Sequence, residues 1–568
     1  MKSFHGLCRS SFNPATFVQL LNHDGDLPVV QAEAGEYGQW FVPAAAGPAA
    51  DGKPLDFLVV WTLPEHISPA FNRLLRFEPA TLEACLQDVD DFCQAILKMS
   101  GPAPLIFLPL WVVPSYHRGL GVLDLSREHG VRRVLADMNA RLCRNFSGST
   151  NVFPLNAARW IESSGKRAFQ PKLWYMTKNP FGNDVYIEAL RDIKAALAGS
   201  IGKSRKLLVL DLDDTLWGEI VGEVGWQGIR LGGHDYIGEA FQDFQRSLKA
   251  LKNRGVLLAI ASKNDERVAL EAIQRHPEMI LKLEDFVGWR INWNDKAANI
   301  VDLVRTLNLG LDSVVFIDDN EFERQRVRNA VPEIFVPDWP ADKTQYAATL
   351  MGLRCFETLQ LSAEDAARTA MYQQENERAR ARLEHGSMEE WLAAAGFTVT
   401  VTPLEEVDLA RVVQLINKTN QMNLSTRRLT EPELKQWQEN TGAAIWSLRV
   451  ADRYGDSGLV GVVSVMADTE DPEAARIVDF LLSCRVFGRK IEDVMLHLAV
   501  EWARSRQKTK VLATCVPTEK NGVCLDFWKS SGCECRGNDN TFSWETQKAH
   551  ALPAHIQFQE NVPAAAVR

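Results

Sequence analysis

The sequence predicts an α/β protein with three domains. Its 568 residues are several times the length of an ordinary domain. Apolar strand-like runs alternate with amphipathic helical stretches within residues 1–197, 205–350 and 395–548, and such alternation is typical of α/β layer folds. Residues 351–394 contain a highly charged stretch with a helical pattern, residues 363–384. We interpret them as a connector whose charges form a solvated face.

The composition excludes several classes of protein. The hydrophobic share of 46% and the charged share of 24% are ordinary for a soluble globular protein. The formal net charge of -10 argues against a nucleic-acid scaffold, which needs a basic surface. The most apolar stretch, residues 104–113, is too short and too rich in proline to span a bilayer, and the N-terminus shows no signal-peptide pattern. The ten cysteines form no CxxC pair, which favours reduced thiols and a cytoplasmic protein.

The first domain is predicted to contain a buried parallel sheet covered by helices. The expected strands lie within residues 56–63 and 103–113, and the expected helices are residues 82–99 and 185–199. The domain has no GDS-type serine motif, and neither His66 nor His117 has a serine or aspartate context that suggests catalysis. We therefore expect a catalytically silent domain that packs on the next domain or docks a partner, followed by a polar linker over residues 198–206.

The second domain begins with a buried strand, residues 207–210, that ends in acidic residues. Ligands of α/β sheets bind at the carboxyl edge of the strands. Asp211 and Asp213 are two residues apart, so both can emerge at that edge while Leu212 turns the other way. One carboxylate can attack phosphorus, and the other can protonate the leaving oxygen and later activate water. We assign the first role to Asp211 and the second to Asp213.

Three later elements complete a candidate phosphotransfer site. One strand ends at Ser262, a lysine follows at Lys296, and a further strand ends at Asp318 and Asp319. A carboxylate cluster of this kind favours a hard divalent ion, most simply Mg²⁺. The expected phosphate-binding residues are Thr215, Ser262 and Lys296, and the expected metal ligands are Asp211, the main-chain carbonyl of Asp213, Asp318 and Asp319.

This ordered set of motifs resembles the haloacid-dehalogenase (HAD) superfamily over about residues 205–350. The resemblance implies a Rossmann-like core that works through an aspartyl phosphate. Members of that superfamily insert specificity caps after the first motif or between the serine and lysine motifs. Here residues 217–244 lead quickly into a helix, and only residues 263–295 separate Ser262 from Lys296. The core is therefore predicted to be capless, so that a neighbouring domain or a partner protein must shield the site from water.

Longer stretches resemble the FkbH-like branch of that superfamily, subfamily IIIC. They are DLDDTLWGEIVGEVGWQGIRL (211–231), FIDDNEFER (316–324), INKTNQMNLSTRRLT (416–430) and LLSCRVFGRKIED (481–493). The resemblance covers about residues 200–545, and the first domain is similar in layout to the SGNH-like domain of long members. It implies an enzyme that dephosphorylates 1,3-bisphosphoglycerate and delivers the glyceryl group to the phosphopantetheine thiol of an acyl carrier protein. Such products enter polyketide or surface-polysaccharide pathways.

The chain departs from that family at a few positions. The family usually has asparagine at the position of Asp214 and glycine at the position of Glu219, and some relatives have cysteine at the position of Leu212. If that cysteine carries the acyl group in those relatives, this chain must use another thiol or a different reaction.

The third domain resembles GCN5-related N-acetyltransferases, which have a GNAT-like α+β fold. A strand over residues 477–486 is expected to run through a turn into a helix over 493–506. In that fold the turn and the helix N-terminus hold pantetheine and its pyrophosphate. The family's last small residue of this turn is replaced by Lys490 here. The resemblance assigns substrate or pantetheine binding to Arg485 and Gly488, together with Asn264 of the core.

Cys484 ends the predicted strand, near the place where a thioester would lie in that fold. One interpretation makes it an acyl-carrying thiol whose pKa Arg485 lowers. The other makes it a small buried hydrophobic residue, a common fate of free cysteine. The sequence leaves both open.

The leading hypothesis is an FkbH-like enzyme that transfers an acyl group, glyceryl in the first instance, from an acyl phosphate to a carrier protein. Its expected partners are a carrier protein with a phosphopantetheine arm and a phosphorylated small molecule, with no nucleic acid and no membrane. One alternative is an Mg²⁺-dependent phosphatase of a different phosphorylated metabolite. The other is a non-catalytic assembly factor that binds a carrier protein, and the intact aspartates argue against it.

Overall fold

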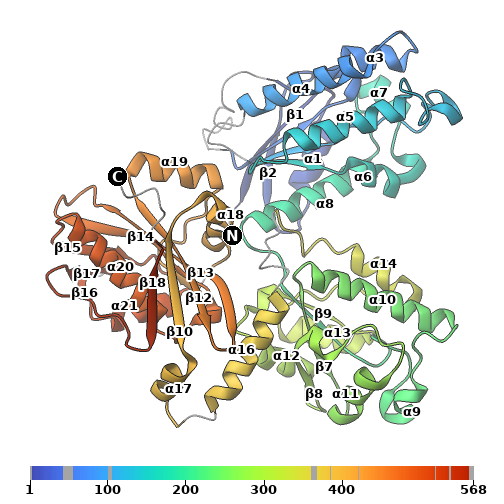
Figure 1. Ribbon diagram of the computed structural model, residues 1–568. Coiled ribbons are helices and arrows are strands. Elements are labelled where there is room, and N and C mark those ends of the chain that lie inside the picture. Colours follow the sequence, from blue (N-terminus) through green and yellow to red (C-terminus); the bar gives the residue numbers. More distant parts are fainter. Residues whose placement is uncertain are drawn as a thin grey trace. The chain divides into compact units, whose positions relative to one another are not determined.

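The computed structural model describes residues 3–41, 55–99, 105–359, 368–383, 386–419, 421–518, 520–536 and 539–561. The chain divides into two compact units, Met1–Ala198 and Gly199–Arg568. Figure 1 shows helices and strands in both units, in agreement with the predicted multidomain α/β fold. No helix in the described ranges is both long enough and apolar enough to cross a bilayer.

The first unit is built on a parallel sheet whose described strands follow the order β2-β1-β3-β4-β5. Helices lie on both faces, because α3 and α4 supply Phe71 and Val89 to the core under one face, whereas Phe17 and Tyr186 contact Trp61 from the other. This arrangement is a doubly wound α/β fold. The strands are β1 (Phe4–Ser10), β2 (Val30–Ala34), β3 (Phe57–Trp61), β4 (Leu105–Pro109) and β5 (Val152–Leu155). The helices are α1 (Ala15–His23), α2 (Pro64–Ile67), α3 (Pro69–Leu75), α4 (Leu82–Met99), α5 (Val131–Asn145), α6 (Ala157–Ser164), α7 (Pro171–Thr177) and α8 (Asn183–Ser200).

The predicted elements of this unit agree with the structure. Helix α4 coincides with the predicted helix, and β3 and β4 lie within the predicted strands, although residues 103 and 104 of the second are outside the described part. The two histidines contact main-chain oxygens: His66 Nδ1 lies 3.0 Å from the carbonyl oxygen of Ser11, and His117 Nε2 lies 3.0 Å from that of Leu75. Each histidine ring therefore has a main-chain partner within this unit.

The second unit begins with the core, a parallel sheet in the order β8-β7-β6-β9. Alternate residues of its strands face opposite layers: Leu208 packs with the helices α10 and α11, and Leu207 packs with α12 and α13. Burial on both faces explains the continuous apolar runs in the sequence. The strands are β6 (Leu207–Leu210), β7 (Leu257–Ser262), β8 (Phe286–Ile291) and β9 (Val314–Ile317). The helices are α9 (Val221–Gly228), α10 (Tyr236–Asn253), α11 (Glu266–Arg275), α12 (Lys296–Thr306), α13 (Glu321–Ala330) and α14 (Tyr346–Met351).

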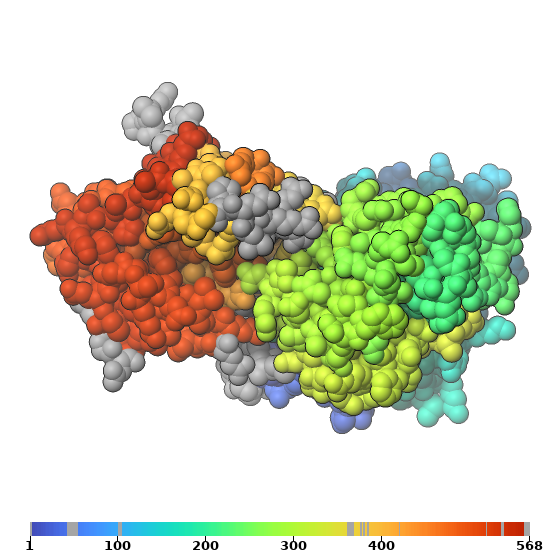
Figure 2. Space-filling view, turned by 90° about the horizontal axis from the view of Figure 1, so that it is seen from below, coloured from blue at the N-terminus to red at the C-terminus, as the bar shows by residue number. Residues whose placement is uncertain are grey.

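The core carries no inserted domain over residues 205–350, all of which are described. Residues 218–235 fold into the short helix α9 and a turn that an antiparallel bridge between Gly218 and Arg230 closes. Residues 263–295 form α11 and β8. The core is therefore capless, as predicted. In the space-filling view of Figure 2 its residues, coloured green to yellow-green, form one closely packed surface.

The connector contains α16 (Arg368–Leu383) and α17 (Met388–Ala395), and residues 363–367 and 384 of the predicted helix lie outside the described part. The expectation of a wholly solvated charged face is wrong for Arg378. This side chain is 2% exposed and donates two hydrogen bonds to Asp452, at 2.6 and 2.8 Å. Tyr372 of the same helix packs against the core. The connector is thus part of the folded unit.

The last region is a mixed sheet whose described strands run β16-β17-β15-β14-β13-β12-β10-β18, with β11 paired to β14. Helix α20 packs in the apolar cluster on one face, and α18 and α19 in the cluster on the other. The strands are β10 (Phe397–Pro403), β11 (Met422–Asn423), β12 (Ala444–Asp452), β13 (Gly455–Ala467), β14 (Ala474–Leu482), β15 (Lys510–Thr514), β16 (Glu534–Arg536), β17 (Thr541–Glu545) and β18 (Ile556–Glu560). The helices are α18 (Glu406–Lys418), α19 (Glu431–Thr441), α20 (Ile491–Ser505) and α21 (Gly522–Ser530).

One predicted strand of this region is too long. The apolar run over residues 477–486 continues past the end of β14 at Leu482, and a single 3₁₀ turn, Cys484–Val486, follows. Val486 is fully buried in that turn. The residue is therefore apolar because it is buried, and not because it belongs to a strand.

Candidate active site

The candidate site lies at the carboxyl edge of the core sheet, where three neighbouring strands end. Leu210 of β6 pairs with Ile260 of β7 on one side and with Ile317 of β9 on the other. Asp211 directly follows Leu210, and Asp318 directly follows Ile317. The parallel register therefore brings the predicted motif residues of separate strands to one place. Ser262, the last residue of β7, is buried at the same edge.

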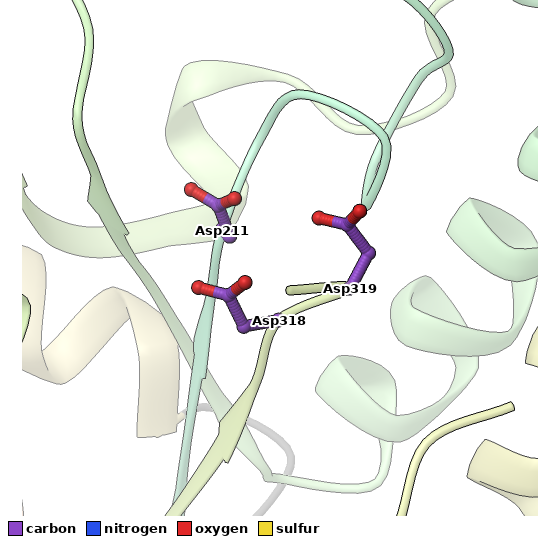
Figure 3. A group of neighbouring side chains, drawn as sticks. All are labelled: Asp211, Asp318 and Asp319. Atoms are coloured by element: carbon purple, nitrogen blue, oxygen red, sulfur yellow. The ribbon is translucent and has the colours of Figure 1, made fainter. Parts of the chain in front are cut away.

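Three carboxylates converge at this edge. One oxygen from each of Asp211, Asp318 and Asp319 lies within 4.8 Å of the others. Figure 3 shows the carboxylate of Asp319 turned toward the other two. Asp211 is 6% exposed and Asp318 is fully buried, so their charges are largely removed from water. Such proximity is costly unless a cation neutralises the group.

Lys296 supplies one cation. It begins α12, and its ammonium group lies 2.9 Å from Asp211 Oδ1 and 2.6 Å from Asp318 Oδ2. Burial alone would lower the pKa of Lys296, but the charges of Asp211 and Asp318 together raise it, so the lysine is cationic. The N-cap residue Asp295 accepts a hydrogen bond from the Ala298 N–H at 3.1 Å, which fixes the start of the helix that carries this lysine.

One lysine does not neutralise three carboxylates. Burial, reinforced by the charge of Asp211, raises the pKa of Asp318 to about 7, even though Lys296 lowers it. Burial and the charge of Asp211 also raise the pKa of Asp319, and Lys343 opposes that rise. Oδ1 of Asp211 is buried and accepts no hydrogen bond from the described residues, despite its ion pair with Lys296. The carboxylate set and this oxygen fit a hard divalent cation such as Mg²⁺.

Asp213 is held by three hydrogen bonds. Its Oδ1 accepts from the Trp217 indole N–H at 3.0 Å and from the Val221 N–H at 3.1 Å, and its Oδ2 accepts from Asn264 Nδ2 at 2.8 Å. Burial raises the pKa of Asp213, the charge of Asp211 adds to the rise, and these donors lower it. A carboxyl group with a raised pKa suits a general acid and base. The structure thus places Asn264, predicted to bind substrate or pantetheine, against the predicted acid/base.

We expect Asn264→Ala to lower the turnover of a phosphate ester on the order of 10-fold, the scale of one hydrogen bond to a charged group. Removing this donor raises the pKa of Asp213. Asp213 therefore stays protonated, and able to protonate the leaving oxygen, up to a higher pH, so the alkaline limb of the pH profile moves upward. A pH profile of kcat/KM measures both effects. The matched control is Asn292→Ala, which removes the asparagine that directly follows β8. An unshifted profile in Asn264→Ala would contradict the assigned contact.

Two basic residues of the site were not predicted. Arg324 Nη1 donates to the carbonyl oxygens of Asp318 and Asp319, each at 2.7 Å. Lys343 Nζ donates to the carbonyl oxygen of Asp214 at 2.8 Å and lies 3.6 Å from Asp319 Oδ2. Both hold main-chain atoms of the two acidic loops. Arg324 ends the stretch FIDDNEFER (316–324), for which the sequence predicts no role at this arginine, and Lys343 lies outside the four stretches that carry the resemblance. Both residues bind main-chain carbonyl groups, which any sequence supplies.

Thr215, which was predicted to bind phosphate, forms hydrogen bonds with Asp319 in this structure. Its hydroxyl group accepts a hydrogen bond from the Asp319 N–H at 3.1 Å and donates to Asp319 Oδ1 at 3.4 Å. The residue is fully buried. Thr215 therefore links the loop after β6 to the loop after β9.

Two departures from the family pattern occupy left-handed backbone positions. Asp214 has a φ of 54° and Glu219 a φ of 75°. The residues expected there by the resemblance, asparagine and glycine, are among those that adopt positive φ most readily. The chain keeps the turn geometry with residues that are less suited to it, so the turn after Asp213 stores some backbone strain.

Cys484 does not lie beside Asp211. It lines a cavity with Lys206 and Leu257, which lie at the amino ends of β6 and β7. From Lys206 to Asp211 the chain advances roughly 16 Å, at about 3.3 Å per residue. The structure therefore brings Cys484 and Arg485 together but places them at the opposite edge of the core sheet from the carboxylates.

The segment with β11 and Leu424 lies between the ends of β14 and β15, next to the turn that was predicted to hold pantetheine. β14 and β15 pair only over residues 474–477 and 510–513. Beyond that, β11 pairs with the end of β14, and Leu424 accepts a hydrogen bond from the Val516 N–H at 3.0 Å. Gly488 and Lys490 follow with φ values of 73° and 60°, so Lys490 adopts the backbone that a glycine takes without strain.

Comparison with known proteins gives a match that bears on the core. No family model matches this sequence, and no curated protein matches it. The N-terminal part of the protein BF1531 from Bacteroides fragilis, containing a phosphatase domain and complexed with Mg, is similar at 28% identity and a TM-score of 0.56. The match covers 64% of this chain and 96% of that chain. The likeness agrees with the predicted phosphotransfer core.

Acetyltransferases of the GNAT family also match. One from Staphylococcus aureus Mu50 is 9% identical, and a ribosomal-protein-alanine N-acetyltransferase from Brucella melitensis is 17% identical. Each match covers 26% of this chain, and 99% and 98% of the respective relatives, at a TM-score of 0.21. At that score the likeness carries no argument about this chain.

Proposed function

We propose that this chain is an Mg²⁺-dependent phosphatase and acyltransferase. It removes phosphate from an acyl phosphate such as 1,3-bisphosphoglycerate and loads the glyceryl group onto the phosphopantetheine arm of an acyl carrier protein in the cytoplasm. The observation that supports the phosphatase part is the convergence of Asp211, Asp318 and Asp319, the first two of which pair with Lys296. The similarity to an Mg-complexed phosphatase domain supports the same conclusion.

The side chains divide the chemistry of phosphate removal. Asp211 attacks phosphorus while Asp213 protonates the leaving oxygen. Asp213, now deprotonated, takes a proton from water as that water attacks the phosphoaspartate, which releases phosphate and restores Asp211. Lys296 neutralises charge at the nucleophile throughout. Asp211, the carbonyl of Asp213, Asp318 and Asp319 would hold Mg²⁺, which when bound neutralises charge on the phosphoryl oxygens.

The acyl-transfer part needs a thiol, because attack at phosphorus alone releases the free acid. In this proposal the Cys484 thiolate attacks the carbonyl carbon of the acyl phosphate, the bond from carbon to the phosphate oxygen breaks, and inorganic phosphate leaves. The thioester then exchanges with the carrier thiol. Cys484 and Asp211 lie at opposite edges of the core sheet. Thioester formation and phosphate removal therefore take place at separate sites, and the glyceryl group must pass from one site to the other.

An experiment on the full chain tests the thiol route. Incubation with 1,3-bisphosphoglycerate should add a glyceryl or phosphoglyceryl group to the protein, which intact mass spectrometry detects. Cys484→Ala should lose this adduct, whereas Cys535→Ala, a change at an exposed cysteine of the same region, should keep it. Persistence of the adduct in Cys484→Ala would show that another cysteine carries the acyl group. Its absence from the wild-type protein would refute the thiol route.

A second candidate function is an Mg²⁺-dependent phosphatase of a different phosphorylated metabolite. The separation of Cys484 from Asp211 favours it, since a plain phosphatase needs only the carboxyl edge of the sheet. Leu212, at the position where some similar proteins have cysteine, favours it too. Phosphate release without any protein adduct would identify this function.

A further inference from the structure

Six large apolar or aromatic side chains of the first unit are between 62% and 99% exposed. They lie after α3, in the loop between β4 and α5, and on α7, and they are Phe77, Tyr116, Val122, Leu125, Tyr175 and Met176. In the rest of the described chain, four side chains of this kind reach the same exposure: Tyr236, Trp293, Phe322 and Val407. We call the six side chains of the first unit the apolar surface. Exposed apolar side chains that gather in one place mark an interaction site.

Contacts between the three segments make the apolar surface continuous. The ring of His117, which follows Tyr116, stacks on the ring of Phe77 with the centroids 6.1 Å apart. Burial raises the pKa of Tyr116, and Tyr175 and Glu65 add to the rise, so the loop after β4 also lies beside α7. The other members of the apolar surface lie further along the same loop and on α7.

A buried aspartate holds the loop between β4 and α5 in place. Asp124 is 4% exposed, and its carboxylate accepts hydrogen bonds from the main-chain N–H groups of Leu120 at 2.9 Å, Val131 at 2.8 Å and Arg132 at 2.8 Å. Gly119 has a φ of 50°, and a Cβ atom there would lie 2.0 Å from Asp124 Oδ1, so only glycine fits. The loop is thus built around Asp124, yet it holds the apolar side chain of Val122 in water, and a partner that covers this side chain removes that cost.

The apolar surface has a basic border, although the whole chain is acidic. Residues 114–130 and 165–178 contain six lysine and arginine residues and two aspartate or glutamate residues, whereas the chain has 63 and 73. One of these two acidic residues is the buried Asp124. The side chains of Arg118, Arg127 and Lys172 are exposed, and none of them pairs with a carboxylate of the described residues. A local excess of positive charge attracts a partner that carries carboxylates.

We propose that the apolar surface and its basic border are a docking site for an acidic protein that presents an amphipathic helix. The apolar stripe of that helix packs on the apolar surface, and its carboxylates pair with Arg118, Arg127 and Lys172 at the border. Such border charges speed association and set the orientation of the partner. A protein fits better than a lipid surface, because four of the six apolar members are aromatic residues or methionine, which together with arginine are enriched at protein interfaces.

A synthetic peptide tests this chemistry on the full chain. The peptide is a fluorescently labelled helix that carries leucine along one face and glutamate beside it, and fluorescence anisotropy measures its dissociation constant. We expect the wild-type chain to bind this glutamate peptide. The binding should weaken as salt is added, because charge pairs at an exposed border are screened.

Variants locate the bound peptide. Val122→Ser combined with Leu125→Ser should raise the dissociation constant of the glutamate peptide at least about 10-fold, because a few apolar anchors carry most of the energy of an interface. The matched control is Val407→Ser, a change at an exposed valine of α18, and it should have no effect.

Charge reversal tests the basic border. Arg118→Glu combined with Arg127→Glu should weaken binding of the glutamate peptide and strengthen binding of a peptide that has lysine in place of glutamate. The matched control is Arg267→Glu, a change at an exposed arginine of α11, and it should leave both affinities nearly unchanged.

The proposal is wrong if the wild-type chain does not bind the glutamate peptide, or if the variant with serine at both apolar positions binds it equally well. It is also wrong if these two changes leave peptide binding unchanged but abolish binding to vesicles of anionic lipid, or abolish self-association in sedimentation. The occupant is then a membrane or a second copy of this chain.

The proposal does not rest on the proposed function, because the apolar surface belongs to the first unit and the phosphatase residues belong to the second. Asp211→Asn should abolish phosphate release and bind the glutamate peptide like the wild-type chain, so failure of either proposal is seen separately.

Discussion

Asp211→Asn should abolish phosphate release. The amide oxygen is a poor nucleophile and cannot form the phosphoaspartate, so turnover should fall at least on the order of 10⁴-fold, the scale seen when a hydrolase loses its nucleophile. No other carboxylate should replace Asp211 as the nucleophile. Asp318, the second carboxylate that contacts Lys296, is fully buried and is not open to a substrate. Release of phosphate from p-nitrophenyl phosphate or acetyl phosphate, with Mg²⁺ present, measures the effect.

Asp214→Asn is the matched control for this variant. It makes the same chemical change three residues later, and the main-chain oxygen of Asp214 accepts hydrogen bonds from Lys343 and Tyr346. Asparagine also tolerates the positive φ of this position. Activity should stay within a few-fold of the wild-type rate. Equal losses in both variants would show a general disturbance of the loop and not the loss of a nucleophile.

Lys296→Met should destabilise the metal-free protein by about 3–5 kcal/mol at pH 8, the cost of leaving a buried charge without its partner. The lysine is 5% exposed, and it contacts the side chains of Asp211, 9% exposed, and Asp318, 0% exposed. The matched control is Lys263→Met, because the pair of Lys263 with Glu323 is 39% exposed at the lysine. That change should cost at most about 1 kcal/mol.

The pH dependence follows from the raised pKa of Asp318. In the folded protein this pKa is about 7, above the value of about 3.9 in an unfolded chain. Such a group contributes its full stability below about pH 4, and that contribution is lost as the pH rises through 7. Removing Lys296 raises the folded pKa further and deepens the loss at alkaline pH. Thermal unfolding in EDTA should therefore show a large difference between variant and wild type at pH 8 and a small one at pH 4.5.

A pH-independent difference would contradict the pairing of Lys296 with the two carboxylates. Added Mg²⁺ should narrow the gap at pH 8, since a divalent ion neutralises the same carboxylates. Equal loss of stability in Lys296→Met and Lys263→Met would show that the burial of the first pair has no energetic consequence.

The core was predictable because its chemistry is local in sequence. Strands buried on both faces appear in the sequence as continuous apolar runs, as β6 and β9 do, and each run ends where the sheet ends. The motif aspartates directly follow these runs, so parallel pairing alone brings Asp211 and Asp318 together. The same reasoning failed at Val486, which is apolar and buried but lies in a turn after β14.

What could not be predicted depends on partners far away in the sequence. Arg378 reads as one charge in a charged helix, and its burial follows from the pair with Asp452, 74 residues later. Arg324 and Lys343 bind main-chain carbonyl groups, which no residue pattern reveals. The cavity beside Cys484 likewise has walls from residues as distant as Lys203 and Lys520.

If Asp211 carries the phosphoryl group during turnover, rapid quenching should trap the phosphorylated enzyme. The full chain is mixed with acetyl phosphate and Mg²⁺ and quenched in acid within the first turnover, and the peptide that contains residues 207–217 is weighed. This peptide should gain the mass of one phosphoryl group in the wild-type protein and in Asp214→Asn, and should gain none in Asp211→Asn. A phosphorylated peptide in Asp211→Asn, or phosphate release by the wild-type protein with the phosphoryl group trapped on a different peptide, would contradict it.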